Sequence, residues 1–256
     1  MEQTPGVYGP LCWGAQTHPG KVRQENQDAF FADAHVGLFV VSDGMGGHRG
    51  GALASGIVAD DLPVMIENAL DKLKVGAPRT IKKLLKKAIA EQSRQLHLEG
   101  NSGSGFKDMG ATTVIALFRT DSCFVANMGD SRAYRLRAGK FTQLSRDHSV
   151  VSELIENGHI EPEEAVDHPA SGQLTHYIGM EEKPRPFVTS FKLRKNDRIL
   201  LCTDGLTDMI SSEEITAVLK AETDPSAACS KLVEAANKAG GHDNVTTLIT
   251  DWNRTA

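Results

Sequence analysis

The sequence is poor in residues that cross-link a chain or anchor it in a membrane. It has four cysteines, Cys12, Cys123, Cys202 and Cys229, too widely scattered for a zinc site or a disulfide framework. No apolar run approaches the length of about 20 residues that a spanning helix needs. The N-terminus lacks the basic start and apolar stretch of a signal peptide. We therefore expect a cytoplasmic protein with no membrane partner.

An excess of positive charge is also missing. The formal net charge is −5 and the isoelectric point is near 6.0, whereas a nucleic-acid-binding domain usually carries a basic footprint. We therefore expect no nucleic-acid partner. With 40% hydrophobic residues in 256, the chain can bury a sizeable core. We expect a single domain over residues 1–256.

The first half of the chain predicts one buried strand and two helices. Residues 36–41 are apolar and β-rich, which predicts a strand ending at Ser42-Asp43. Helical periodicity follows over residues 52–73, where Pro63 is expected to kink or break the helix. Residues 77–100 predict an amphipathic helix. Its polar face carries Lys82, Lys83, Lys86 and Lys87, which we interpret as a solvated face rather than a docking surface.

From Met109 onward the pattern becomes mostly β. Four short segments up to residue 145 predict an antiparallel meander. Residues 146–185 predict a flap-like insertion with a small helix near 150–157 and exposed loop histidines at positions 148, 159, 168 and 176. Strands and helices then mix without strict alternation. This favours an α+β sandwich over a doubly wound parallel sheet.

Four aspartates occupy the ends of predicted strands, each beside glycine or a turn: Asp43, Asp130, Asp204 and Asp243. Any one of them alone is explained by a turn, because Asp-Gly is a common turn dipeptide. If the strands are neighbours, however, the four carboxylates converge and repel one another. A divalent cation with oxygen ligands relieves this repulsion, which points to Mg²⁺ or Mn²⁺ rather than zinc.

Two further residues suit a phosphate substrate at such a centre. Arg23 can bind phosphate oxygens with two parallel donors. In isolation a surface arginine would be the better explanation, but an acidic metal cluster beside it favours a phosphate ligand. Asp28 is placed to hold a metal-bound water.

Six ordered segments of the chain resemble the metal-dependent protein phosphatases of the PPM or PP2C type. They are GKVRQENQD, VVSDGMGGH, GATTVIAL, ANMGDSRAYRL, LLCTDGLTD and GGHDNVTTLI. The forms DGMGGH and GDSRAY are most similar to those of bacterial members. The resemblance implies a four-layer αββα sandwich, in which two antiparallel sheets pack face to face with helices outside. It also implies that the metals sit at one end of the sandwich.

The same resemblance implies roles for individual residues. Asp43 would bridge two metal ions and the Gly44 carbonyl would ligate one of them. Asp204 and Asp243 would complete the shell of the first ion, and Asp130 with Asp204 would hold a third. Arg23 matches the phosphate-binding arginine, and Asp28 would contact metal through water. Thr112 and Thr113 match a supporting strand start.

The implied reaction is in-line attack of a metal-bridging hydroxide on phosphoserine or phosphothreonine, without a phosphoenzyme. Two positions depart from the family pattern. Met45 stands where eukaryotic relatives carry a histidine proposed as general acid, so His48 or a metal-bound water would protonate the leaving group. Gln27 replaces a carboxylate that many relatives carry, which weakens one water-mediated contact. Neither change removes a direct metal ligand.

The expected partners are phosphorylated proteins, including a Ser/Thr kinase or its targets, and the chain is expected to act as a monomer. Two other functions stay open at this point. A pseudophosphatase would keep the fold and bind phosphoproteins without turnover, but such proteins lose carboxylates that are all present here. A metallohydrolase for small phosphoesters is distinguished only by testing substrates.

Overall fold

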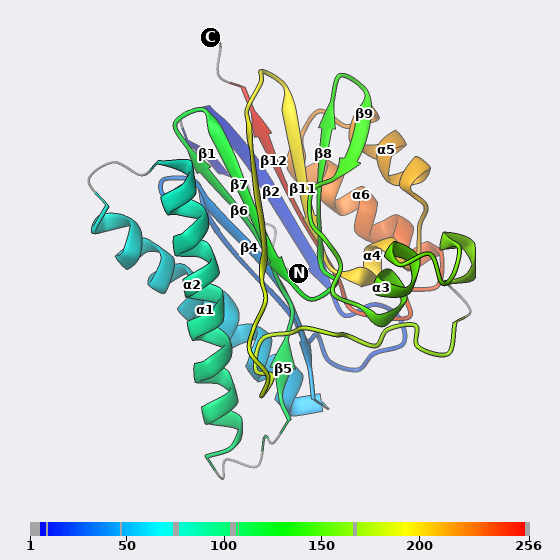
Figure 1. Ribbon diagram of the computed structural model, residues 1–256. Helices are drawn as coiled ribbons and strands as arrows, with labels where there is room; N and C mark the ends of the chain where they lie inside the picture. Colours follow the sequence, from blue (N-terminus) through cyan, green and yellow to red (C-terminus); the bar gives the residue numbers. More distant parts are fainter. Residues whose placement is uncertain are drawn as a thin grey trace.

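Two antiparallel sheets pack face to face, and helices cover both outer surfaces (Figure 1). The structure is a computed structural model that describes residues 6–8, 10–46, 48–73, 77–102, 106, 108–165 and 168–253. In this part of the chain the order of layers is helices, sheet, sheet, helices. The predicted αββα sandwich is confirmed.

The first sheet contains both ends of the described chain. Its order is β1 (Gly6–Tyr8), β2 (Leu11–His18), β12 (Val245–Trp252), β11 (Asp197–Cys202), β8 (Arg132–Arg137) and β9 (Lys140–Gln143). The second sheet has the order β10 (Phe187–Lys192), β7 (Ser122–Met128), β6 (Thr113–Arg119), β4 (Leu38–Met45) and β3 (Asp28–Asp33). The short β5 (Gly110–Ala111) pairs with the end of β4.

Two long helices cover the second sheet, α1 (His48–Asp71) and α2 (Pro78–Gly100), while α5 (Ser212–Ala221) and α6 (Pro225–Lys238) cover the first. Shorter helical segments complete the fold: α3 (Val150–Glu156), the 3₁₀ turn Pro162–Glu164 and α4 (Asp204–Thr207). Among the described helices, none is long and apolar enough to cross a membrane.

The apolar run in β4 is continuous because both faces of the strand are buried. Leu38 and Val40 pack toward α1 and α2, whereas Phe39 and Val41 point between the two sheets. All four side chains are inaccessible to water. Since successive residues of a strand face opposite sides, one unbroken apolar segment fills two core layers. This packing fixes the register of β4 and therefore the position of Asp43 at its end.

Two local predictions are corrected. β4 does not stop at Ser42-Asp43 but continues to Met45, since its last residues pair with β5. Pro63 does not break α1, which runs as one helix from His48 to Asp71. Its neighbours Leu62 and Ile66 are fully buried, and their packing offsets the hydrogen bond that proline cannot make.

The predicted meander is wrong in topology, although its strands are present. β6 and β7 form a hairpin in the second sheet, whereas β8 and β9 form a hairpin in the first. The chain changes sheets between Met128 and Arg132. Asp130 therefore lies at the corner where the chain passes between the two layers.

Candidate active site

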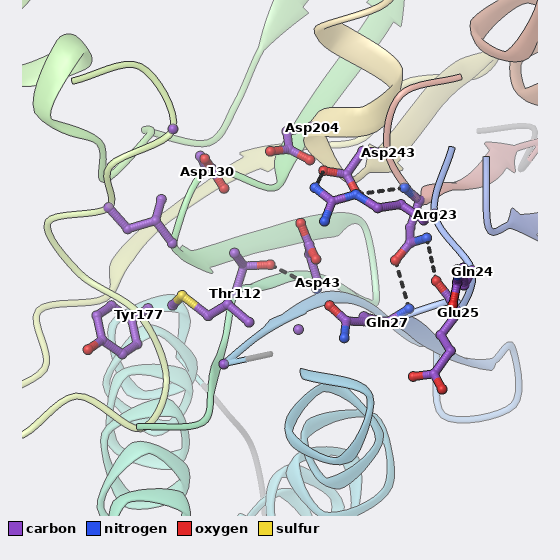
Figure 2. A pocket seen from close by; sticks show the side chains of 16 residues that line it. Arg23, Gln24, Glu25, Gln27, Asp43, Thr112, Asp130, Tyr177, Asp204 and Asp243 are labelled. Atoms are coloured by element: carbon purple, nitrogen blue, oxygen red, sulfur yellow. Dashed lines mark hydrogen bonds and ion pairs between the residues drawn. The ribbon is translucent and has the colours of Figure 1, made fainter. Parts of the chain in front are cut away.

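The strand-end aspartates meet in one pocket at the end of the sandwich (Figure 2). Asp43 comes from β4, Asp130 from the β7–β8 corner, Asp204 from the residues after β11, and Asp243 from the turn before β12. Among the described residues that line this pocket, Arg23 is the only lysine or arginine. Residues more than 200 positions apart in the sequence thus face a common space, as the predicted convergence requires.

Asp43 is held in place by the segment that leads into β6. Its backbone N–H donates to Thr112 Oγ1 over 3.0 Å, and the Thr112 N–H donates to the Asp43 carbonyl over 2.8 Å. Thr112 Oγ1 also lies 2.6 Å from Ser131 Oγ, beside the corner that carries Asp130. The threonine therefore links two of the carboxylate-bearing segments. The sequence anticipated a supporting role for Thr112 but not the part of Ser131.

Asp28 lies directly across from Asp43 in the β3–β4 pair and is buried. Its Oδ2 accepts hydrogen bonds from Thr203 Oγ1 (2.9 Å) and Thr246 Oγ1 (2.8 Å). Its Oδ1 has no hydrogen-bond partner. The two threonines come from the first sheet, so Asp28 bridges the layers beneath the pocket. Sequence reasoning missed both threonines.

The glycines that follow Asp43 and Asp204 are required by close packing. A Cβ on Gly44 would lie 1.9 Å from the Gly51 carbonyl oxygen at the start of α1. A Cβ on Gly205 would lie 1.9 Å from the Asn244 carbonyl oxygen. Neither position can accept a side chain without backbone movement. These contacts fix the segments that carry the two aspartates against their neighbours.

Burial and mutual repulsion raise the pKa values of the clustered carboxyl groups. Removal from water is the largest cause for Asp28, whose pKa rises to about 7, and for Asp130, whose pKa rises to about 6. The pKa values of Asp43 and Asp204 are raised by burial and by the other aspartates of the cluster. Negative charge is in excess in this site, which favours a bound cation.

The donor set fits a hard divalent cation. Carboxylate oxygens predominate, and the buried Asp204 Oδ1 has no hydrogen-bond partner, so a ligating atom is available. No three Asp, Glu, His or Cys side chains in the described chain already surround a common point closely enough to hold an ion. Binding of an ion would draw these carboxylates closer together.

Arg23 and Asp243 form an ion pair with a distance of 2.8 Å between Nη2 and Oδ2. The loop that carries Arg23 is fixed by Asn244, whose Nδ2 donates to the carbonyls of Pro19 and Glu25. Asn244 Oδ1 accepts from the Gln27 N–H over 2.7 Å. Asn244 is thus a positioning residue that sequence reasoning missed, although it stands next to Asp243 in a motif that was singled out.

The flap-like region contributes Gly172, Leu174 and Tyr177 to the pocket wall. One prediction about its histidines is wrong. His148 is buried, and its Nδ1 accepts a hydrogen bond from the Gly129 N–H over 3.2 Å, beside Asp130. Burial lowers the pKa of His148 to about 4, and His176 and Arg146 add to the effect. The side chain of His48 lies outside the described residues, so its predicted role stays a prediction.

Comparison with known proteins agrees with this fold. Residues 17–249 match the family model of protein phosphatase 2C. The chain therefore belongs to the protein phosphatase 2C family.

Individual relatives cover nearly the whole chain. It is 32% identical over 241 residues to the serine/threonine phosphatase stp of Listeria welshimeri, covering 93% of this chain and 94% of that protein. The crystal structure of the Mycobacterium tuberculosis serine/threonine phosphatase PstP/Ppp superimposes with a TM-score of 0.84 at 32% identity, covering 95% of this chain and 99% of the other. A structure of the PstP catalytic domain with two manganese ions gives a TM-score of 0.78 at 30% identity, with coverage of 95% and 99%.

Proposed function

We propose that this protein is a divalent-metal-dependent phosphatase that removes phosphate from phosphoserine and phosphothreonine in proteins. The observation that carries the proposal is the pocket in which four strand-end aspartates and a single arginine face one another. Family membership supports the protein substrate, since relatives across most of this length are serine/threonine phosphatases.

The proposed metal ligands are the carboxylates of Asp43, Asp204 and Asp243 and the Gly44 carbonyl, with Asp130 and Asp204 for a third ion. Asp28 would act through water. Mg²⁺ or Mn²⁺ in this site would supply a nucleophilic water of lowered pKa and neutralise phosphate charge. The two-manganese complex of a relative supports this choice of metal class. The raised pKa values of Asp28 and Asp130 also support it, because burial is their largest cause and a cation would offset the cost of burying the charged carboxylates.

Arg23 is proposed to bind the phosphate group of the substrate. Its side chain is 54% exposed and its partner in the ion pair, Asp243, is 39% exposed. Ion pairs at that exposure contribute little free energy, so Arg23 can exchange Asp243 for phosphate oxygens at small cost. Its planar guanidinium can donate two parallel hydrogen bonds to the substrate. The exchange also frees Asp243 to act as a ligand.

Met45 lines the pocket together with Leu174 and Tyr177 of the flap-like region, residues 146–185. In the proposed complex these side chains would face the serine or threonine side of the substrate, while the aspartates would face its phosphate. His48 is proposed to protonate the departing serine or threonine oxygen. The in-line geometry, the opposition to a Ser/Thr kinase, the cytoplasmic location, the single domain over 1–256 and the monomeric state belong to the same proposal.

The test is hydrolysis of a phosphothreonine peptide by the metal-free protein, with Mn²⁺ or Mg²⁺ added and then removed with EDTA. Turnover that requires metal and disappears on chelation is expected. p-Nitrophenyl phosphate, a small phosphomonoester, and a small phosphodiester serve as comparison substrates. Turnover restricted to these small esters would redirect the proposal to a metallohydrolase, and binding of the phosphopeptide without turnover would indicate a pseudophosphatase.

A further inference from the structure

An apolar groove lies between α1 and α2 on the outer helical layer, away from the active site. Residues of both helices and of the turn after α1 line it: Met65, Ala69, Leu73, Thr80, Lys83, Leu84, Lys87 and Ala88. Val64, which precedes the groove residue Met65 on α1, is one of the few large apolar residues in the described chain that are mostly exposed, at 55%. A partner's apolar side chain that covers this surface would remove apolar area from water, which is favourable by a free energy of about 25 cal/mol for each Å² buried.

The rim of the α1–α2 groove is strongly basic. Lys82, Lys83, Lys86 and Lys87 lie on the same two turns of α2. In the described chain, no ion pair joins any of them to an acidic group. A second hollow across α2 is lined by Arg79, Thr80, Lys82, Lys83, Lys86 and Val188. Neither hollow has an Asp or Glu among its lining residues.

This arrangement differs from an ordinary solvated helix face. Lys82 and Lys86, and Lys83 and Lys87, are spaced i to i+4, where like charges destabilise a helix. The basic cluster also runs against the net charge of −5 of the whole chain. A solvated face needs no apolar groove along its edge. The unpaired lysines border a concave apolar surface. Such a surface is complementary to a ligand that carries carboxylates on either side of an apolar side chain.

The groove is distant from the pocket. α1 begins at His48, three residues after Met45 at the active-site end, and the groove begins at Met65. At the rise of an α-helix, these seventeen residues span about 25 Å. A ligand in the groove therefore leaves the carboxylate pocket open.

We propose that the α1–α2 groove binds an acidic peptide segment of another protein, with one large apolar side chain inserted between the helices. The acidic residues of the segment would pair with Lys83 and Lys87 on the rim and reach Arg79, Lys82 and Lys86 across α2. A peptide is favoured over an anionic membrane because the apolar surface is a groove between two helices, which accepts a protruding side chain rather than a flat layer.

The proposal does not depend on the phosphatase activity, because it is tested by binding alone. A displayed library of random dodecapeptides would be selected on the full-length protein. Selected peptides are expected to combine Asp or Glu with Leu, Ile, Phe or Trp. Fluorescently labelled copies would then be titrated with the protein by anisotropy. The double substitution Lys83→Glu/Lys87→Glu should weaken binding by about tenfold or more, and added salt should weaken binding to the wild type.

Two control variants separate the groove from general charge effects. Lys140→Glu/Lys195→Glu changes the net charge equally at two exposed lysines elsewhere and should leave the affinity unchanged. Ala69→Trp should fill the groove and abolish binding without altering the charge. Circular dichroism and the thermal midpoint confirm folding of each variant.

Some outcomes would overturn the proposal. One is the selection of peptides with no excess of Asp or Glu. Another is an equal loss of peptide affinity in Lys83→Glu/Lys87→Glu and Lys140→Glu/Lys195→Glu. The third is unchanged peptide affinity in a folded Ala69→Trp variant. Sedimentation with phosphatidylserine vesicles that depends on Lys83 and Lys87, with no peptide selected, would assign the surface to a membrane instead.

Discussion

Arg23 and Asp243 are paired across 220 residues of sequence, with Nη2 of the arginine 2.8 Å from Oδ2 of the aspartate. One is the proposed phosphate ligand and the other a proposed metal ligand. In the metal-free protein, the proposed phosphate ligand and a proposed metal ligand are therefore bound to each other. It also indicates that metal and substrate phosphate each compete with an internal partner.

Substitution of Arg23 should impair substrate binding more than folding. Arg23→Ala removes charge-assisted hydrogen bonds to phosphate, which are worth about 1.5–3 kcal/mol, so KM for a phosphopeptide should rise by roughly tenfold to a hundredfold. The thermal midpoint should change little, because the ion pair is exposed. Steady-state kinetics measure the first effect. Arg94→Ala, which breaks the exposed pair with Glu91 on α2, is the matched control and should leave KM unchanged.

Asp204→Asn should abolish turnover while the fold is retained. The loss should exceed the roughly 10–100-fold effect of altering a partner that only supports a metal ligand. In EDTA the thermal midpoint should be unchanged or higher, because one charge is removed from a repulsive cluster. Asp121→Asn, at an exposed ion pair with Lys192, is the control for charge alone. Wild-type activity in Asp204→Asn would reject this residue as a ligand.

The pH dependence of stability should reveal the raised pKa of Asp28. Its folded pKa is about 7 against an ordinary value of 3.8, so its stabilising contribution is complete below about pH 4 and is lost as the pH rises through 7. Asp28→Asn keeps an oxygen acceptor for Thr203 and Thr246 but cannot ionise. The thermal midpoint of Asp28→Asn minus that of the wild type, measured in EDTA, should therefore increase from acidic to mildly alkaline pH.

Using this difference removes the opposing effect of His148, whose lowered pKa of about 4 makes stability fall as pH decreases. That effect is common to both proteins. A difference that stays constant with pH would show that Asp28 is not protonated in the metal-free fold.

Gly205→Ala should destabilise the protein, because the new Cβ would stand 1.9 Å from the Asn244 carbonyl oxygen. Relief of this overlap should cost roughly 1–3 kcal/mol and shift Asp204 and Asn244 apart. Chemical denaturation measures the cost. Gly56→Ala is the matched control within α1, where nothing lies within 4 Å of the added Cβ. It should stabilise by roughly 0.5–1 kcal/mol through helix propensity.

The α+β sandwich and the four strand-end aspartates were predictable from local patterns, whereas the four-layer order was implied by the family resemblance. Apolar runs of strand length ended at Asp43 and Asp204, and the register of a buried strand fixes the residue at its end. Pairing between sheets was not predictable in this way. The hairpins β6–β7 and β8–β9 look alike in sequence, and only the long-range pairing of β8 with β11 places the second hairpin in the other sheet.

The supporting residues were missed for a similar reason. Thr203 and Thr246 contact Asp28 across 175 and 218 residues, and no local pattern marks a threonine for such a contact. His148 was expected to be exposed because it lies in a polar segment rich in proline and glycine. Its burial depends on packing against the β7–β8 corner and His176, which is a tertiary contact.

The proposed activity depends on divalent cations bound by the strand-end carboxylates, and crystals grown with Mn²⁺ test this most directly. An anomalous difference map should show at least two peaks in the pocket. Both should contact Asp43, and one of them should also contact Asp204 and Asp243. A map without peaks at these carboxylates, from crystals of protein that hydrolyses a phosphothreonine peptide equally well in EDTA, would contradict it.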